Sequence, residues 1–298
     1  MSNMHGFITA LGTPLDQNGI FFESSFRQQI IDQVAYQAAG LLVMGSMGLG
    51  VFVRSCDYVK VVATAVDATR GHCPVFVGVT DTSVGRTCER IDAIVDLAID
   101  GVVATPPYYY CASEQELIVF YRELSRRSRF PLYLYDLPVA ARSKITLATI
   151  EGLQGEGNIK GIKTADMPLA LALQQRIGTQ LPEDFRVLYS GLDTFDAAYA
   201  HGITCHLDGM LACTAPLASR MYQALAGGFS AEGTRILREI ISLRDVFARE
   251  SIFPSFTVAM NLLGYAGCFH PDYYLMPSRA QTDLIRQTMQ ALDLIGTT

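Results

Sequence analysis

The chain is 298 residues long, half of its residues are hydrophobic and 17% are charged. A net charge of −6 with no basic run argues against nucleic acid or an anionic membrane as the main partner. No apolar stretch is long enough to cross a bilayer, and the first residues lack the pattern of a signal peptide. The seven cysteines include no C-x-x-C pair, so we expect reduced thiols in a soluble, cytoplasmic protein without disulfides or a zinc site.

Short apolar runs alternate with longer helical patterns along most of the chain. The short runs are almost continuously hydrophobic, which is typical of parallel strands that are covered on both faces. The expected strands are residues 7–11, 41–45, 74–79, 101–105, 131–135, 159–164, 186–190 and 205–211, and the expected helices between them are residues 25–37, 57–69, 85–97, 113–128, 146–153, 167–177 and 194–201.

Eight such strand–helix units predict an α/β fold of the (β/α)₈ TIM-barrel type, since doubly wound sheets usually have fewer strands. After the eighth strand the pattern is helical only, at residues 216–226, 231–249, 253–264 and 277–294. We therefore expect a catalytic barrel over residues 1–215 and a C-terminal helical extension, residues 216–298, packed on it.

Lys163 lies in an apolar, strand-like segment, although the chain has only four lysines. Lys160 and Lys163 are three residues apart, so their side chains lie on opposite faces of a strand and one of them faces inward. A buried amine is costly unless it is paired or deprotonated, and the neutral amine is the form that attacks a carbonyl. The alternative is a lysine at a strand end that extends into solvent.

Polar or flexible residues follow five of the expected strands. Ser46 follows the second strand, Tyr108 the fourth and Gly191 the seventh, while Tyr135 ends the fifth and Lys163 the sixth. Because the carboxyl ends of barrel strands open onto one mouth, where barrel enzymes carry their active sites, we expect these residues to share a site. This gathering favours Lys163 as a catalytic nucleophile.

Six short motifs occur in a characteristic order. Together they resemble the dihydrodipicolinate synthase/N-acetylneuraminate lyase family, whose members are class I aldolases that act through a lysine Schiff base. The motifs are the segment 6–14, Gly-Ser-Met-Gly at 45–48, Thr-Pro-Pro-Tyr-Tyr at 105–109, Tyr-Asp-Leu-Pro at 135–138, Gly-Ile-Lys at 161–163 and Gly-Leu-Asp at 191–193.

The resemblance implies a mechanism. Lys163 would attack the keto carbon of pyruvate or of a pyruvate-containing substrate, and Tyr135 would move the protons. Ser46 and a tyrosine from the neighbouring subunit, matched by Tyr108, would form the relay that supports Tyr135. The backbone amides of Ser46 and Met47 would bind the pyruvyl carboxylate.

The resemblance also implies further contacts and an assembly. Gly191, Asp193 and Leu211, at the ends of the seventh and eighth strands, are expected to contact the substrate. Sharing a tyrosine between subunits requires at least a dimer, and the family pattern suggests a homotetramer made of two tight dimers. The histidines are not spaced as metal ligands and no phosphate-binding loop occurs, so no metal and no cofactor are expected.

Several positions depart from the family pattern and affect the choice of substrate. Met47 and Leu49 replace a hydroxyl residue and a glutamate. Ala140 stands where dihydrodipicolinate synthases carry an arginine for the carboxylate of the aldehyde, and Arg142 is displaced by two residues. Sialic-acid lyases have two adjacent acidic residues where this chain has only Asp193.

We therefore expect an aldolase or lyase that cleaves or makes a 2-keto-3-deoxy sugar acid or a related compound, in the manner of N-acetylneuraminate lyase. The partners would be a 2-keto acid, pyruvate, and an aldehyde or sugar acid. Two alternatives stay open. One is a condensation of the dihydrodipicolinate synthase type, and the other is a non-catalytic barrel that binds a keto acid.

Overall fold

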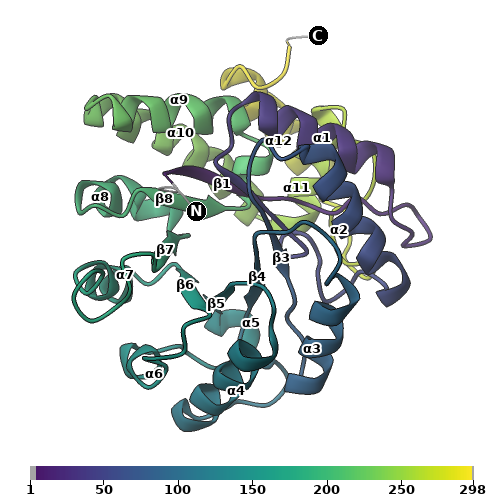
Figure 1. Cartoon of the computed structure of the whole chain (residues 1–298). Coiled ribbons are helices and arrows are strands. Elements are labelled where there is room, and N and C mark those ends of the chain that lie inside the picture. Colours follow the sequence, from purple (N-terminus) through teal and green to yellow (C-terminus); the bar gives the residue numbers. More distant parts are fainter. Residues whose placement is uncertain (1–4, 297–298) are drawn as a thin grey trace.

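The computed structural model describes residues 5–296. The strands hydrogen-bond in sequence order into a closed parallel barrel, in which β8 returns to β1 (Figure 1). This confirms the predicted (β/α)₈ fold. The strands are β1 (Gly6–Ala10), β2 (Gly40–Val43), β3 (Val75–Gly78), β4 (Gly101–Ala104), β5 (Leu132–Asp136), β6 (Ile159–Thr164), β7 (Arg186–Tyr189) and β8 (Cys205–Asp208).

Helices surround the barrel and follow its strands (Figure 1). Within residues 5–296, none of them combines the length and the hydropathy that crossing a membrane requires. The α-helices are α1 (Glu23–Ala35), α2 (Ser55–Thr69), α3 (Val84–Ala93), α4 (Glu114–Arg127), α5 (Pro138–Ala141), α6 (Leu147–Glu151), α7 (Met167–Gln174), α8 (Phe195–Ala200), α9 (Ala215–Ala226), α10 (Ser230–Ala248), α11 (Ile252–Leu262) and α12 (Arg279–Ala291), and the 3₁₀ helices are η1 (Leu192–Thr194) and η2 (Met210–Ala212).

The eighth strand is shorter than the expected 205–211. The carboxylate of Asp208 accepts a hydrogen bond from the amide of Met210 at 2.8 Å, which turns the chain out of the sheet and into η2. Leu211 therefore lies in η2 and not on a strand. Local side-chain capping of this kind competes with the sheet and is not visible in an apolar pattern.

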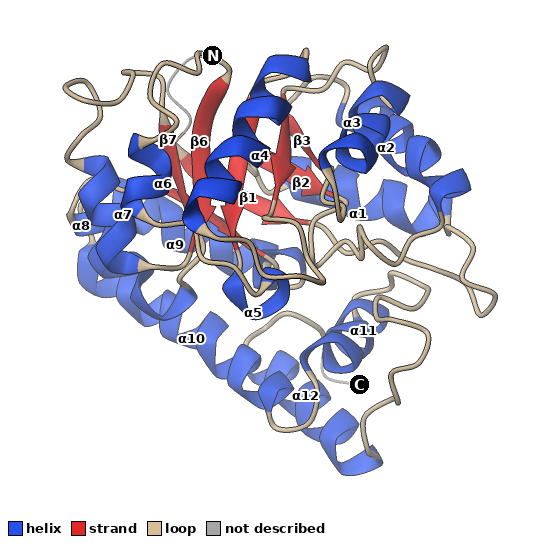
Figure 2. Cartoon of the chain, turned by 90° about the horizontal axis from the view of Figure 1, so that it is seen from below, coloured by secondary structure: helices blue, strands red, loops and turns tan. Residues whose placement is uncertain are grey.

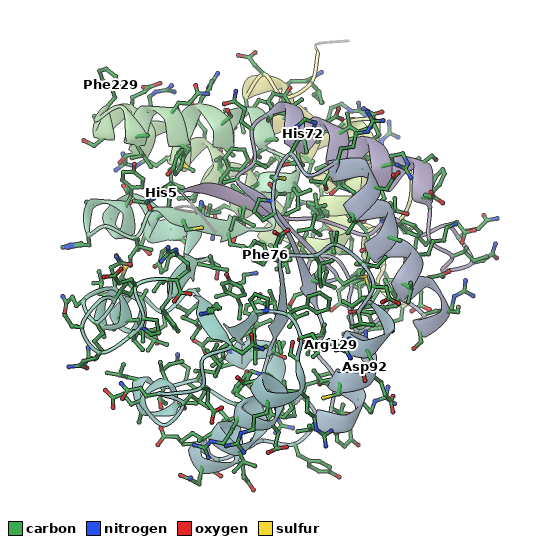
Figure 3. The ribbon with its side chains drawn as sticks, in the orientation of Figure 1. His5, His72, Phe76, Asp92, Arg129 and Phe229 are labelled. Carbon is green, nitrogen blue, oxygen red and sulfur yellow. The ribbon has the colours of Figure 1, made fainter. Side chains whose placement is uncertain are left out.

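Side chains of the strands fill two separate apolar regions, as expected for a barrel whose strands are covered on both faces. The larger region lies between the strands and the helices. The smaller one fills the barrel interior, where Phe76 lies (Figure 3). Phe76 packs edge-on against Tyr133 with ring centroids 5.1 Å apart. A Cβ on Gly161 would lie 2.9 Å from the same Tyr133 ring, so glycine is needed there.

The helices after β8 have two different positions. Helix α9 packs against β1 and so closes the ring between the last and the first strand. Helix α10 packs along α9, whereas α5 and α11 lie beyond one end of the strands, opposite the start of β1 (Figure 2). The division of the chain at residue 215 stays a prediction, since the helix that begins there belongs to the ring.

Candidate active site

A cavity of about 450 Å³ opens at the carboxyl ends of β2 to β5. It contains three of the four residues that were expected to be catalytic, namely Ser46, Tyr108 and Tyr135. The complete lining is Met44, Gly45, Ser46, Gly50, Val51, Phe52, Gly78, Thr80, Val103, Thr105, Tyr108, Tyr135, Leu137, Ala140, Ala141, Phe253, Pro271 and Tyr274.

Lys163 lies directly beside this cavity. Ile162 packs toward the helices, so the alternation along β6 turns Lys163 into the barrel, where it is 5% exposed. Its Nζ lies 4.1 Å from the ring centroid of Tyr135, the residue opposite it on β5. Lys160 occupies a register shift in β6 and forms an ion pair with Asp184 at 2.7 Å. The prediction that one lysine of the pair faces inward is confirmed.

The loop after β2 holds its backbone in a strained, closely packed turn. Met44 and Leu49 have φ values of 56° and 54°, which residues other than glycine rarely adopt. A Cβ on Gly50 or Gly78 would lie about 2 Å from the carbonyl oxygen of Met44. The buried hydroxyl of Thr13 donates to the carbonyl of Gly48 at 2.6 Å and fixes the far side of the turn. Strain of this kind is typical of functional sites.

This turn presents polar backbone groups at the cavity. Among the described residues, none accepts a hydrogen bond from the amides of Ser46 or Met47. The side chain of Ser46 is exposed at the cavity, whereas that of Met47 packs on Gly209, the first residue after β8. Both amides are therefore free of an internal partner, and their role in binding a carboxylate stays a prediction.

The three consecutive tyrosines after β4 differ in position. Tyr108 is partly buried and lines the cavity of its own chain. Tyr109 and Tyr110 are 70% and 79% exposed, and their rings meet edge to face at 4.9 Å. Tyr109 also has a φ of 96°, a strained value for a residue with a side chain.

A charged cluster lies behind Tyr108. Burial opposes ionisation of Asp81, but hydrogen bonds from Arg86, the Thr82 amide and Arg90 outweigh it and lower the pKa of Asp81 to about 2. Burial, aided by the negative charge of Asp81, raises the pKa of Tyr108. The Tyr108 phenol is therefore a hydrogen-bond donor at neutral pH and a poor base.

Asp136, the residue after Tyr135, has a buried carboxylate held by three hydrogen bonds. Its carboxylate accepts hydrogen bonds from Lys144 Nζ at 2.5 Å, Thr164 Oγ1 at 3.0 Å and the Ile145 amide at 3.1 Å. These bonds tie the ends of β5 and β6 together one residue beyond Tyr135 and the lysine opposite it. The positive charge of Lys144 offsets the charge of the buried carboxylate.

The three residues expected near β7 and β8 have other surroundings. Asp193 forms a bidentate ion pair with Arg244 of α10, with N–O distances of 2.5 and 2.9 Å. A Cβ on Gly191 would lie 2.3 Å from the Tyr189 hydroxyl, so this glycine makes room for a neighbouring side chain. Leu211 is fully buried in the core between strands and helices. None of the three lines the cavity.

Residues of the barrel interior beside the cavity, and residues of the cavity itself, were not identified from the sequence as parts of the site. Leu207 on β8 packs inside the barrel in the same cluster as Tyr135. Because side chains alternate between the two faces of a strand, the inward direction of Leu207 could have been predicted. Phe253, Pro271 and Tyr274 reach the cavity from the C-terminal part of the chain. Helical periodicity gives no indication of that long-range contact. Among the described residues, no group of three histidine, cysteine or acidic side chains is arranged to hold a metal ion.

Solved structures share this fold. A chloride-inhibited dihydrodipicolinate synthase from Acinetobacter baumannii, complexed with pyruvate, superimposes with a TM-score of 0.89 and 18% identity, covering 98% of this chain and all of that one. At this identity the likeness concerns the fold alone.

Curated relatives and a family model extend the comparison to sequence. The 4-hydroxy-tetrahydrodipicolinate synthase of Bradyrhizobium diazoefficiens is 26% identical over 268 residues, which are 88% of each chain. That of Rhodospirillum centenum is 26% identical over 293 residues, or 97% of this chain and 99% of the relative. Residues 3–292 match the model of the dihydrodipicolinate synthetase family. The chain therefore belongs to this family, and the expected class of enzyme, a lyase that acts through a Schiff base, is confirmed.

Proposed function

We propose that the protein is a pyruvate-dependent class I aldolase in which Lys163 forms the Schiff base. The observation that carries this proposal is the inward position of Lys163, with its amine 4.1 Å from the ring centroid of Tyr135 and Tyr135 lining the cavity. A nucleophilic lysine needs an enclosed site and a neighbouring group that can move protons. Lys163 is buried, and Tyr135 is the neighbouring group.

Pyruvate fits the polar end of the cavity. Its carboxylate would accept hydrogen bonds from the amides of Ser46 and Met47, which no described residue accepts. The pyruvate complex of the Acinetobacter baumannii relative supports the same keto acid here. The rest of the cavity, about 450 Å³ in all, leaves space for a second substrate.

The chemistry follows from these positions. The free amine of Lys163 adds to C2 of pyruvate, and the keto oxygen leaves as water to give an iminium. Loss of a C3 proton, for which Tyr135 is the adjacent proton-transfer group, gives an enamine that attacks the aldehyde carbon. The aldehyde oxygen takes up a proton, and water then hydrolyses the iminium to release the 4-hydroxy-2-oxo acid.

The condensing direction has more support than cleavage of a sugar acid. Both curated relatives are named as synthases, which favours the second of the three functions considered from the sequence. Asp193, which a sugar-acid substrate was expected to contact, is held by Arg244 instead. The sugar-acid function is therefore the less favoured of the two catalytic proposals.

Reductive trapping tests the proposal directly. Borohydride treatment in the presence of pyruvate should add the reduced pyruvyl group to Lys163, as peptide mass spectrometry would show. Lys163→Ala should give no adduct, and Lys163→Arg should fail as well because the guanidinium stays protonated. Lys160→Ala, a matched change on the same strand, should be trapped normally. Absence of any adduct on the wild-type protein would leave the non-catalytic barrel as the better proposal.

A further inference from the structure

We infer that the aldehyde partner is uncharged and aromatic. This inference rests on the proposed function, because it concerns the molecule that meets the enamine of pyruvate in the same cavity. It follows from three properties of that cavity. Its lining carries no formal charge, its threonine hydroxyls form hydrogen bonds within the protein, and one of its walls is aromatic.

The described side chains that line the cavity include no aspartate, glutamate, lysine, arginine or histidine. The ionisable groups among them are the phenols of Tyr108, Tyr135 and Tyr274. A carboxylate on the aldehyde would lose its hydration here without a counterion, once the two loop amides hold pyruvate. Burying an unpaired charge is strongly unfavourable, so the cavity selects against such aldehydes.

Neighbouring arginines do not supply the missing charge. The position where a carboxylate-binding arginine was expected is Ala140, whose side chain lines the cavity. Arg142 is exposed, caps the end of α5 and does not line the cavity. Arg90 reaches the back of the cavity wall, where it donates to the carbonyl of Gly50 at 3.1 Å, but its guanidinium is paired with Asp81 at 2.9 Å.

The threonine hydroxyls of the lining are already engaged. The hydroxyl of Thr80 accepts a hydrogen bond from the amide of Thr105 at 3.0 Å, and the hydroxyl of Thr105 donates to the carbonyl of Pro106 at 2.8 Å. Among the described lining residues, the hydroxyls of Ser46, Tyr108, Tyr135 and Tyr274 have no hydrogen bond. Ser46 and Tyr135 are assigned to pyruvate and its proton transfer, which leaves two phenols for the several hydroxyls of a polyhydroxylated aldehyde. Each unpaired hydroxyl costs free energy, so a sugar-like aldehyde fits poorly.

An aromatic wall takes the place of polar groups. Phe253 and Tyr274 meet edge to face with centroids 6.3 Å apart, and Phe52 faces the cavity from the loop after β2. Val51 and Leu137 complete the apolar surface. An aromatic ring would bury its full area against these side chains and could stack or meet their edges, which an aliphatic chain cannot do.

The reaction for this substrate class is balanced without a further reactant. Pyruvate and an aromatic aldehyde give a 4-aryl-4-hydroxy-2-oxobutanoate: the C3–H bond of pyruvate breaks, a bond forms from C3 to the aldehyde carbon, and the proton ends on the new hydroxyl. The water released in forming the iminium is used again in its hydrolysis.

A panel of three aldehydes with the full-length protein tests the inference. Benzaldehyde represents the aromatic class, succinic semialdehyde carries a carboxylate, and glyceraldehyde is hydroxylated. With pyruvate consumption as the readout, kcat/KM for benzaldehyde should exceed the other two by about 10-fold or more, the range expected for apolar selectivity. Trapping of pyruvate on Lys163 is measured first, so that a failure of the proposed function is recognised separately.

Two variants sharpen the test. Ala140→Arg introduces a cation into the lining and should raise the succinic semialdehyde to benzaldehyde ratio of kcat/KM by about 10-fold or more. Phe253→Ala should raise KM for benzaldehyde while leaving pyruvate trapping intact. Phe229→Ala is its matched control, because Phe229 is 69% exposed at the start of α10, far from the barrel interior (Figure 3).

The results of this panel distinguish the aromatic aldehyde from the charged and the hydroxylated ones. Preference for benzaldehyde, lost in Phe253→Ala but kept in Phe229→Ala, supports the inference. Trapping on Lys163 together with preference for succinic semialdehyde or glyceraldehyde overturns it and leaves the aldolase proposal standing. Trapping with no turnover of benzaldehyde also overturns it.

Discussion

The two halves of the barrel mouth differ in what their polar side chains can still bind. On the half formed by β2 to β5, Ser46, Tyr108 and Tyr135 line an open cavity. On the half formed by β7 and β8, Asp193 is paired with Arg244. Both halves lie at the carboxyl ends of strands, where barrel chemistry is expected. A position at a strand end places a polar side chain at the mouth, but the side chain can bind a substrate only if no other residue of the protein already pairs with it.

The largest expected effect comes from removing one hydroxyl on the β2-to-β5 half of the mouth. Tyr135→Phe keeps the ring that lies 4.1 Å from the amine of Lys163 but removes its hydroxyl, and it should reduce turnover by about 10²- to 10⁴-fold, as for other proton-transfer groups. Some pyruvate should still be trapped, because the nucleophile remains. Steady-state turnover and borohydride trapping, measured on the same preparation, distinguish these two steps.

Tyr133→Phe is the matched control for that change. Tyr133 lies two residues earlier on β5 and faces the same barrel interior, but it packs on Phe76. Burial raises its pKa to about 12, so it stays protonated at neutral pH. Turnover should be close to that of the wild type, and a large loss would move the proton-transfer role from Tyr135 to Tyr133.

A tyrosine of a second subunit is expected to complete the site on the β2-to-β5 half of the mouth. Tyr108 lines the cavity of its own subunit, so the shared tyrosine is better matched by Tyr109, which is exposed and held at a strained φ of 96°. Mixing Lys163→Ala with Tyr109→Phe subunits should restore about a quarter of wild-type activity, since half the dimers are mixed and each contains one complete site.

Mixing Lys163→Ala with Tyr108→Phe subunits is the companion experiment and should restore nothing. Subunit exchange must be shown by native mass spectrometry in both mixtures. Recovery with Tyr108→Phe alone would return the shared role to Tyr108, as first expected from the sequence. No recovery in either mixture, with exchange demonstrated, would mean that each site is built within one chain and would remove the argument for a dimer of dimers.

The sequence predicts the barrel well because its signals are local and repeated. Each strand is a short, buried apolar run, and eight of them in regular alternation with helices allow few other folds. The errors lie at element ends. The four-residue helix α5 was missed altogether, and the early end of β8 depends on a single contact, the Asp208 carboxylate that accepts the Met210 amide. Apolar periodicity contains no information about such contacts.

The site was predictable only in part, for a related reason. Lys163, Tyr135 and Ser46 were identified because strand alternation and strand ends fix their direction. Asp193 was placed at the same mouth correctly, but its partner Arg244 is 51 residues away in sequence and could not be foreseen. The aromatic wall depends on contacts of the same long range. Long-range pairing therefore decides which of the well-placed polar residues remain available to a substrate.

On the β7 and β8 side of the barrel, a smaller effect is expected on the stability of the protein at acidic pH. His206 on β8 is fully buried, stacks on Phe195 at 4.1 Å, and neither of its ring nitrogens has a hydrogen-bond partner among the described residues. Burial, with a contribution from the charge of Lys163, lowers the pKa of His206 from 6.5 to about 3. Between these values the unfolded chain binds a proton that the folded chain does not, so stability falls as the pH drops.

His206→Phe should remove this loss. Urea unfolding at pH 7 and pH 5 should show a decrease in the wild-type free energy of unfolding on the order of 1 kcal/mol per pH unit from this residue, and a smaller decrease in the variant. His72→Gln, at an exposed position, should retain the wild-type decrease (Figure 3). Equal decreases in His206→Phe and the wild type would show that the imidazole is protonated in the folded protein.

The smallest expected effect belongs to Asp193→Ala. Its carboxylate is 62% exposed and paired with Arg244, so the change should cost at most about 1 kcal/mol in the free energy of unfolding. Turnover should stay near that of the wild type, because the side chain does not line the cavity. Asp184→Ala is the matched control, since Asp184 is 58% exposed, precedes β7 where Asp193 follows it, and is likewise held by a cation, Lys160. A large rise in KM in Asp193→Ala but not in Asp184→Ala would mean that the Arg244 pair opens to bind substrate, and it would bring the β7 half of the mouth back into the site.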